Sequence, residues 1–170
     1  MIRMSGSGLK VGAVGLFSLI LGGCYGFAGG GLPGHIRTVA ILPFDNQTAE
    51  PTLTQEVNEA LTEAMERRLG LRLASEATAD AVVRGAITQY VPDAPLSFQS
   101  GQTGNVSVTR RMVQLSLRVE IYDQRENRIL WERSGLRVDG EYTPPDDQVG
   151  RKVALDKLVN DIVDGAQSQW

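Results

Sequence analysis

The chain has 170 residues with 17 basic and 20 acidic side chains, which gives a formal net charge of −3. Such a mildly acidic chain lacks the overall charge that general nucleic-acid binding requires. Its single cysteine excludes a disulfide within the chain and a multi-cysteine metal site. The single histidine, His35, directly follows Pro33 and Gly34, a poor setting for a Ser-His-Asp triad. Composition and length fit one globular domain.

The first 23 residues have the pattern of a secretory signal peptide. Arg3 and Lys10 supply positive charge, and an uncharged apolar run follows over residues 11–21. This run is too short to span a bilayer, which takes about 20 apolar residues. We therefore predict a lipoprotein signal peptide over residues 1–23, a Gly-rich tether over residues 24–34 and a single domain over residues 35–170.

The signal ends in Leu21-Gly22-Gly23-Cys24, which resembles the lipobox of bacterial lipoproteins. In that pathway the cysteine thiol is alkylated by a diacylglycerol and becomes the new N-terminus. We therefore expect Cys24 to be the lipid-attachment residue, carrying acyl chains such as palmitate. The alternative is an ordinary free cysteine after a plain signal peptide. Loss of Arg3 and Lys10, with no acidic residue lost, would change the formal charge from −3 to −5.

The first half of the domain reads as strand, helix and short strand. Residues 36–44 contain a continuous apolar run typical of a buried strand, and residues 45–48 read as a turn. From Thr52, apolar residues recur every three or four positions, which predicts an amphipathic helix that ends at Gly70. Thr52 and Gln55 have the spacing of a capping box. Residues 71–74 form a possible short strand.

The second half predicts a meander followed by a helix. We expect a strand over 81–90, closed by Pro92 and Pro95, and then a polar loop over 91–106. A strictly alternating strand over 113–122 follows, and a turn over 123–127 connects it to a strand over 129–138 that is bulged at Ser134-Gly135. A polar loop over 140–148 leads to the last helix over 149–166. In such a meander, loops 91–106 and 140–148 lie at the same end of the sheet.

These elements predict an α+β fold with two layers. We expect a two-layer α/β sandwich, in which two helices pack on one face of a mostly antiparallel sheet of three to four strands. The alternating strands support this arrangement, since one face of the sheet would be covered and the other would face solvent.

No enzyme motif is apparent in the sequence. The phosphate-binding loop, the nucleophile elbow and the HExxH zinc motif are all missing. The pair Asp146-Asp147 allows a weak acid–base hypothesis, although a solvated turn that also caps the last helix is the simpler interpretation. Arg110 and Arg111 either are solvent-exposed charges at the edge of the sheet or contact anionic groups. Trp131 is interpreted as a packing residue.

Several segments together resemble the lipopolysaccharide-assembly lipoprotein family, LptE. The most specific is LPGHIRTVAILPFDNQTAEPTL over residues 32–53, and the segment EATADAVVRGAI over residues 76–87 comes second. The opening Cys24-Tyr25-Gly26-Phe27, the long alternating strand and the closing helix match in the same order. The likeness covers nearly all of the chain after the signal peptide.

This resemblance implies a non-enzymatic outer-membrane lipoprotein without cofactor or resident metal. Members of the family plug the β-barrel LptD, help it to assemble and assist the transfer of lipopolysaccharide to the outer leaflet. In the family, basic residues that contact lipopolysaccharide lie on loops at one end of the sheet, equivalent to loops 91–106 and 140–148 here. The basic residues nearest the corresponding loops here are Arg110, Arg111, Arg151 and Lys152.

Two other classes of protein remain open from the residues alone. One is a different outer-membrane lipoprotein with a similar opening strand, such as a secretion-pore subunit or a regulator of a cell-wall synthase. The other is a lipid-anchored hydrolase that uses Asp146 and Asp147.

Overall fold

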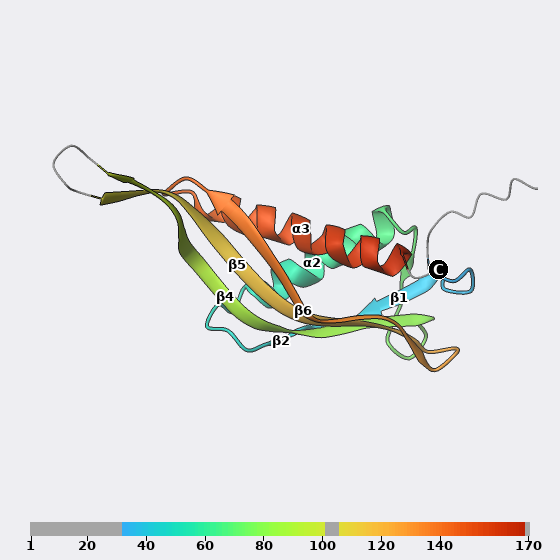
Figure 1. The fold of residues 1–170 in the computed structure, drawn as a ribbon. Helices are drawn as coiled ribbons and strands as arrows, with labels where there is room; N and C mark the ends of the chain where they lie inside the picture. The colour runs from blue at the N-terminus through green and yellow to red at the C-terminus, as the bar shows by residue number, and fades with distance from the viewer. Residues whose placement is uncertain (1–31, 101–105, 169–170) are drawn as a thin grey trace, which may run out of the picture.

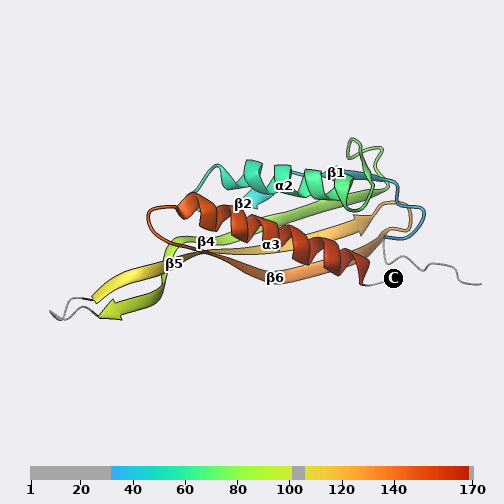
Figure 2. The ribbon, with the colours of Figure 1, turned by 90° about the horizontal axis from the view of Figure 1, so that it is seen from above.

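The computed structural model describes residues 32–100 and 106–168, which form two helices over one face of a six-stranded sheet (Figures 1 and 2). The predicted signal peptide, Cys24 and most of the tether lie outside the described residues. The elements in chain order are β1 (Thr38–Ile41), β2 (Asp45–Asn46), α2 (Leu53–Arg67), β3 (Arg72–Leu73), β4 (Ala81–Ser100), β5 (Val106–Asp123), β6 (Arg128–Tyr142) and α3 (Asp147–Gln167). The predicted two-layer α+β architecture is confirmed. None of the helices among these residues is long and apolar enough to cross a bilayer.

The sheet is larger and more mixed than the three to four mostly antiparallel strands predicted. Its order is β3-β1-β4-β5-β6, and β2 pairs with β4 beside this path. The three short strands pair in parallel: β1 with β3 and β4, and β2 with β4. Helix α2 carries the chain back along the sheet, so β3 runs in the same direction as β1. Strands of two to four residues are too short for sequence periodicity to report their direction.

Both helices follow the apolar pattern that predicted them. Helix α2 buries Leu53, Val57, Leu61, Ala64 and Met65 against the sheet, and each large buried apolar side chain contributes ~1.5–3 kcal/mol. Gly70 has a φ of 66°, the left-handed conformation that ends a helix at low cost.

The predicted capping box at the start of α2 is wrong. Thr52 itself has helical dihedral angles, and its hydroxyl donates to Glu50 instead of accepting from the backbone of α2. Gln55 bonds to Glu59, one turn further along the helix.

The core lies between the helices and the alternating face of β5. Its inward residues are all at most 1% exposed: Val113, Leu115, Leu117, Val119 and Ile121. Trp131 of β6 is 5% exposed and packs against the backbone of Gly165 on α3, as its interpretation as a packing residue requires. The opposite face of the sheet is polar, with cross-strand contacts such as Arg84 to Glu120 at 2.7 Å.

The predicted loop over 91–106 is wrong, because β4 and β5 continue as a hairpin. Their pairing extends to Ser100 and Val106, and Figure 1 shows the hairpin leaving the body at the end opposite to the start of the described chain. Pro92 and Pro95 are accommodated because the pairing shifts register between Val91 and Ala94 and again after Pro95. Sequence rules treat such prolines as strand ends, whereas bulges let the strand pass through them.

Three other boundaries can be compared. The predicted turn at 45–48 is partly wrong, because Asp45–Asn46 forms β2 before the chain turns. The loop predicted over 140–148 begins later, since β6 runs to Tyr142. The bulge at Ser134-Gly135 is confirmed, because these two residues of β6 lie opposite the single residue Arg118 of β5, between the pairs Leu117–Leu136 and Val119–Arg133.

Candidate functional site

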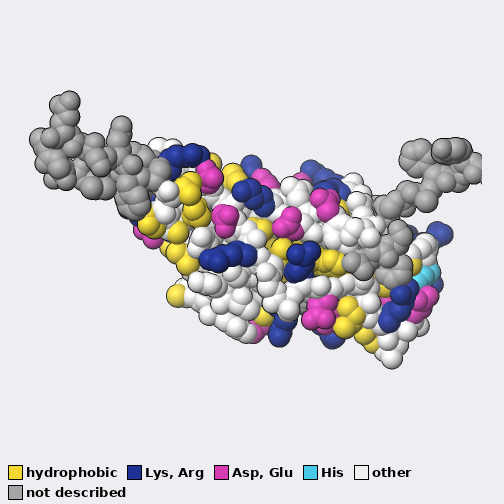
Figure 3. All heavy atoms as spheres, viewed as in Figure 1, with side chains coloured by type: hydrophobic (Ala, Val, Ile, Leu, Met, Phe, Trp, Pro, Cys, Tyr) yellow, Lys and Arg dark blue, Asp and Glu magenta, His cyan; other side chains and the backbone are white. Residues whose placement is uncertain are grey.

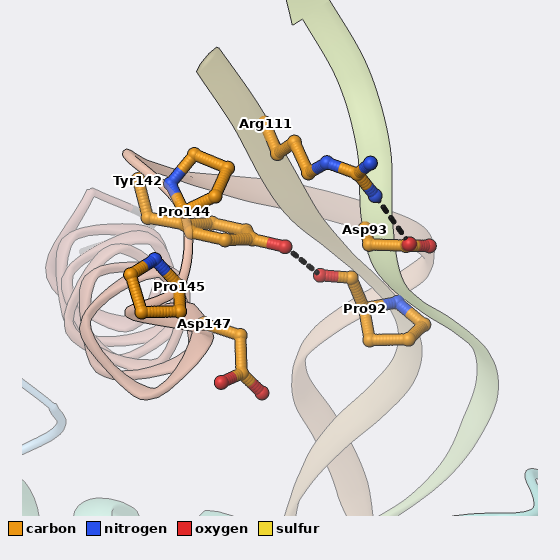
Figure 4. A pocket seen from close by; sticks show the side chains of 7 residues that line it. All are labelled: Pro92, Asp93, Arg111, Tyr142, Pro144, Pro145 and Asp147. Atoms are coloured by element: carbon orange, nitrogen blue, oxygen red, sulfur yellow. Dashed lines mark hydrogen bonds and ion pairs between the residues drawn. The ribbon is translucent and has the colours of Figure 1, made fainter. Parts of the chain in front are cut away.

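An open cleft lies at the base of the hairpin, where β4 and β5 pass the end of β6 and the start of α3 (Figure 4). Its volume is about 500 Å³, and it is lined by Pro92, Asp93, Arg111, Tyr142, Pro144, Pro145 and Asp147. The predicted meeting of the segments near loops 91–106 and 140–148 at one end of the sheet is therefore confirmed.

Tyr142 forms the wall between the end of β6 and the hairpin. Its side chain is buried, and its hydroxyl donates to the carbonyl oxygen of Pro92 at 3.1 Å (Figure 4). Burial raises the pKa of Tyr142, and the Asp93 carboxylate raises it further. The phenol therefore stays protonated and can keep donating to Pro92 throughout the neutral pH range.

Two glycines let α3 approach β6 closely at this end. A Cβ built on Gly140 would lie 1.7 Å from the carbonyl oxygen of Gly150, and one on Gly150 would lie 2.6 Å from the ring of Tyr142. Only glycine avoids these overlaps, so the pair fixes where the first turn of α3 crosses the strand. This contact sets the position of Asp147 beside the cleft.

Arg110 and Arg111 point to opposite faces of β5, as neighbours on a strand must. Arg111 forms an ion pair with Asp93 of β4 at 2.5 Å, and Arg110 pairs with Glu141 of β6. These pairs are largely exposed, so each contributes only ~0–1 kcal/mol and can exchange for another anion. Both arginines thus remain candidates for contact with phosphate groups.

Arg151 lies in a more enclosed position between the two helices and β4. Its guanidinium is 3.1 Å from the Glu56 carboxylate and 3.2 Å from the Thr52 hydroxyl, and it lies 5.4 Å from the centre of the Tyr90 ring. Burial alone would lower the pKa of Arg151, but Tyr90, Glu56 and Glu50 outweigh it and raise the pKa. Arg151 therefore ties α3 to the start of α2.

Lys152, by contrast, is exposed. It lines an interhelical groove of about 510 Å³ together with acidic residues of α2. The four predicted basic residues therefore lie at the same end of the molecule in separate environments: Arg111 in the cleft, Arg110 on the opposite sheet face, Arg151 between the helices, and Lys152 at the groove.

The acidic pair lies at the start of α3, and Asp147 lines the cleft. Asp146 immediately precedes α3, and Asp147 is its first residue. Asp146 holds the N-cap position but makes no side-chain hydrogen bond to the helix, so the predicted cap does not form through a hydrogen bond. His35 lies at the opposite end of the sheet, where its Nε2 is 2.7 Å from Asp123. Sequence reasoning missed this contact, because 88 residues separate its two partners.

The comparisons with known proteins agree with the fold. A family model described as "LptE: Lipopolysaccharide-assembly" matches residues 36–167. A solved hypothetical protein from Chlamydia trachomatis is similar, with 15% identity, a TM-score of 0.53, and coverage of 78% of this chain and 97% of that chain. A protein of a family of unknown function from Xanthomonas campestris matches with 11% identity, a TM-score of 0.53, and coverage of 82% and 91%. At these identities both likenesses show the fold alone. No curated protein matches the chain.

Proposed function

Because the chain belongs to the LptE family of lipopolysaccharide-assembly proteins, we propose that it plugs and helps to assemble the β-barrel LptD in the outer membrane. In this role it assists the transfer of lipopolysaccharide to the outer leaflet and catalyses no reaction. The observation that carries the proposal is the family match over residues 36–167, which includes all the helices and strands of the domain.

The start of the described chain supports the proposed anchor at Cys24. Leu32 packs against the core. The described chain begins at the end of the molecule opposite to the hairpin (Figure 1). The eight residues from Cys24 to Leu32 can span at most about 26–29 Å. The lipid would therefore hold this end of the domain close to the inner face of the outer membrane.

The hairpin supports the proposed place within a barrel. Strand β4 has 20 residues, which corresponds to roughly 65 Å of extended chain. The hairpin therefore reaches far from the proposed anchor. The sheet face away from the helices presents Arg84, Glu120 and Arg137, and polar side chains of this kind suit the polar interior of a large outer-membrane barrel.

Arg110, Arg111, Arg151 and Lys152 remain the proposed lipopolysaccharide contacts. Arg111 is placed best, because the cleft offers proline rings and Tyr142 beside its guanidinium. A phosphate would displace Asp93 from Arg111 and form a charge-assisted hydrogen bond in its place. Lys152 needs no such exchange, since it forms no ion pair among the described residues.

The test is copurification of the tagged, lipidated protein from its own envelope. We expect the β-barrel LptD in the complex, and we expect the barrel to fail to assemble when this protein is depleted. A Cys24→Ala variant is the control for the anchor, because it removes the thiol that would be alkylated. A complex without a barrel would refute the proposal. A ring-shaped oligomer or a bound cell-wall synthase would favour the other lipoprotein classes.

A further inference from the structure

A cluster of one histidine and two carboxylates lies at the end of the sheet where the described chain begins. His35 Nε2 is 2.7 Å from Asp123 Oδ2, and His35 Nδ1 is 3.8 Å from Glu126 Oε1. His35 precedes β1, whereas Asp123 is the last residue of β5 and Glu126 lies in the turn between β5 and β6. Figure 3 shows the histidine at the molecular surface, at the end opposite to the hairpin.

Asp123 fixes the orientation of the imidazole ring. Its side chain is fully buried, and its Oδ1 accepts the backbone N–H groups of Arg125 at 2.8 Å and of Glu126 at 3.1 Å. Both oxygens of Asp123 thus act as acceptors, Oδ1 for two backbone N–H groups and Oδ2 for the imidazole, which is the bonding pattern of a carboxylate. A carboxylate accepts, so His35 Nε2 carries the proton that bridges to Oδ2.

When Nε2 carries the only ring proton, the lone pair is on Nδ1, which lies 3.8 Å from Glu126 Oε1. Either a proton on Nδ1 or a metal ion can lie between these two atoms. Glu126 Oε2 already bonds to Arg128 Nε at 2.6 Å, which leaves Oε1 available for a second cation.

The distances suit a zinc ion. Zinc binds histidine nitrogen and carboxylate oxygen at about 2.0–2.2 Å in tetrahedral geometry, which places the two ligand atoms about 3.4 Å apart. The side chain of Glu126 is 48% exposed and can move by the small difference from 3.8 Å. A carboxylate behind the ring, as Asp123 is here, orients most metal-bound histidines.

We propose that His35 Nδ1 and Glu126 Oε1 bind a zinc ion, with Asp123 orienting the imidazole and water completing the coordination. The ion joins the segment that follows the tether to the β5–β6 turn, and so fixes the direction in which the tether leaves the domain. With two protein ligands, the affinity is lower than that of a four-ligand structural site. The proposal does not depend on the proposed function.

The test uses the fact that His35 is the only histidine of the chain. The mature chain is prepared without a polyhistidine tag and with Cys24→Ser, so that no other imidazole or thiol competes for zinc. Nitrogen NMR then follows one imidazole. We expect zinc to shift the Nδ1 signal much more than the Nε2 signal. An Nδ1 signal that zinc leaves unchanged would overturn the proposal.

A second test measures the unfolding, with and without zinc, of the parent chain and of three variants. At free zinc ten times the dissociation constant, the folding constant of the parent chain rises ~11-fold. His35→Gln can still donate to Asp123 but lacks Nδ1, and should lose this rise. Glu126→Gln should reduce it. The matched control Glu76→Gln removes an exposed carboxylate at the same end and should retain it. Equal stabilisation by zinc in His35→Gln or in Glu126→Gln would refute this ligand set.

Discussion

Asp80 joins the starts of β1 and β4, and its replacement by asparagine tests whether this contact is electrostatic. One carboxylate oxygen accepts three hydrogen bonds at 2.9 Å, from the N–H groups of Arg37 and Thr38 and from the Thr38 hydroxyl. The other oxygen is 2.7 Å from Arg125 Nε. Led by the Arg37 amide, these donors outweigh the cost of burial and lower the pKa of Asp80 from 3.8 to about 2. Asparagine retains one acceptor but loses the charge.

The expected size of the effect follows from the pKa. A decrease from 3.8 to about 2 corresponds to roughly 2 kcal/mol of folding free energy, since each pKa unit corresponds to about 1.4 kcal/mol. Asp80 is 6% exposed, but Arg125 is 61% exposed, so solvent weakens the ion-pair part of this stabilisation more than the hydrogen bonds to Arg37 and Thr38. Because the pKa is lower in the folded protein, the stabilisation is complete above about pH 4 and is lost as the pH falls to 2.

Urea unfolding of the wild type and Asp80→Asn at neutral and acid pH measures this directly. We expect the variant to lose ~2 kcal/mol of unfolding free energy at pH 7 and the difference to shrink towards pH 2. Asp156→Asn changes an exposed carboxylate on α3 and should have little effect at either pH. A loss at Asp80 that is the same at both pH values would refute the electrostatic reasoning and leave only a packing effect.

Three further substitutions test the packing of the hairpin end and the core. Gly150→Ala places a Cβ 2.6 Å from the Tyr142 ring, so we expect a loss of ~1–3 kcal/mol by thermal unfolding, whereas Gly135→Ala, which meets no atom within 4 Å, should be tolerated. Trp131→Ala should cost ~3–5 kcal/mol, and a cost below 1 kcal/mol would contradict the burial of the ring against α3. Arg151→Met leaves the Glu56 carboxylate without its partner in a half-buried position, and we expect ~1–3 kcal/mol of destabilisation by urea unfolding at neutral pH.

The sequence predicts the parts of the fold that depend on regular burial. The period-two pattern of residues 113–121 placed β5 correctly, and the spacing from Leu53 to Met65 placed α2, because each pattern reports which side of an element meets the core. The short parallel strands carry no such signal. The sequence does not predict that the hairpin continues past Pro92, because proline ordinarily ends a strand. At a bulge the strand can continue past a proline.

The candidate site was predictable in place but not in detail. Meander topology brings residues 91–95 and 142–147 to one end of the sheet, whichever side chains they carry. The partner of each arginine depends on register, which the sequence does not encode locally. Arg111 meets Asp93 only because two register shifts in β4 bring that carboxylate alongside. His35 and Asp123 meet through the pairing of three strands, so no local pattern could connect them.

The direction of the hairpin depends on contacts at its base, because β4 changes register there. Between Val91 and Ala94 the ladder with β5 is interrupted, and a strand can bend at such a point. The Tyr142 hydroxyl holds the Pro92 carbonyl oxygen within this interruption. The Gly140–Gly150 contact in turn holds Tyr142 against α3. If the hairpin has to enter a partner, these contacts set its angle to the body, and loss of the Tyr142 hydroxyl should impair assembly with the partner more than it impairs folding.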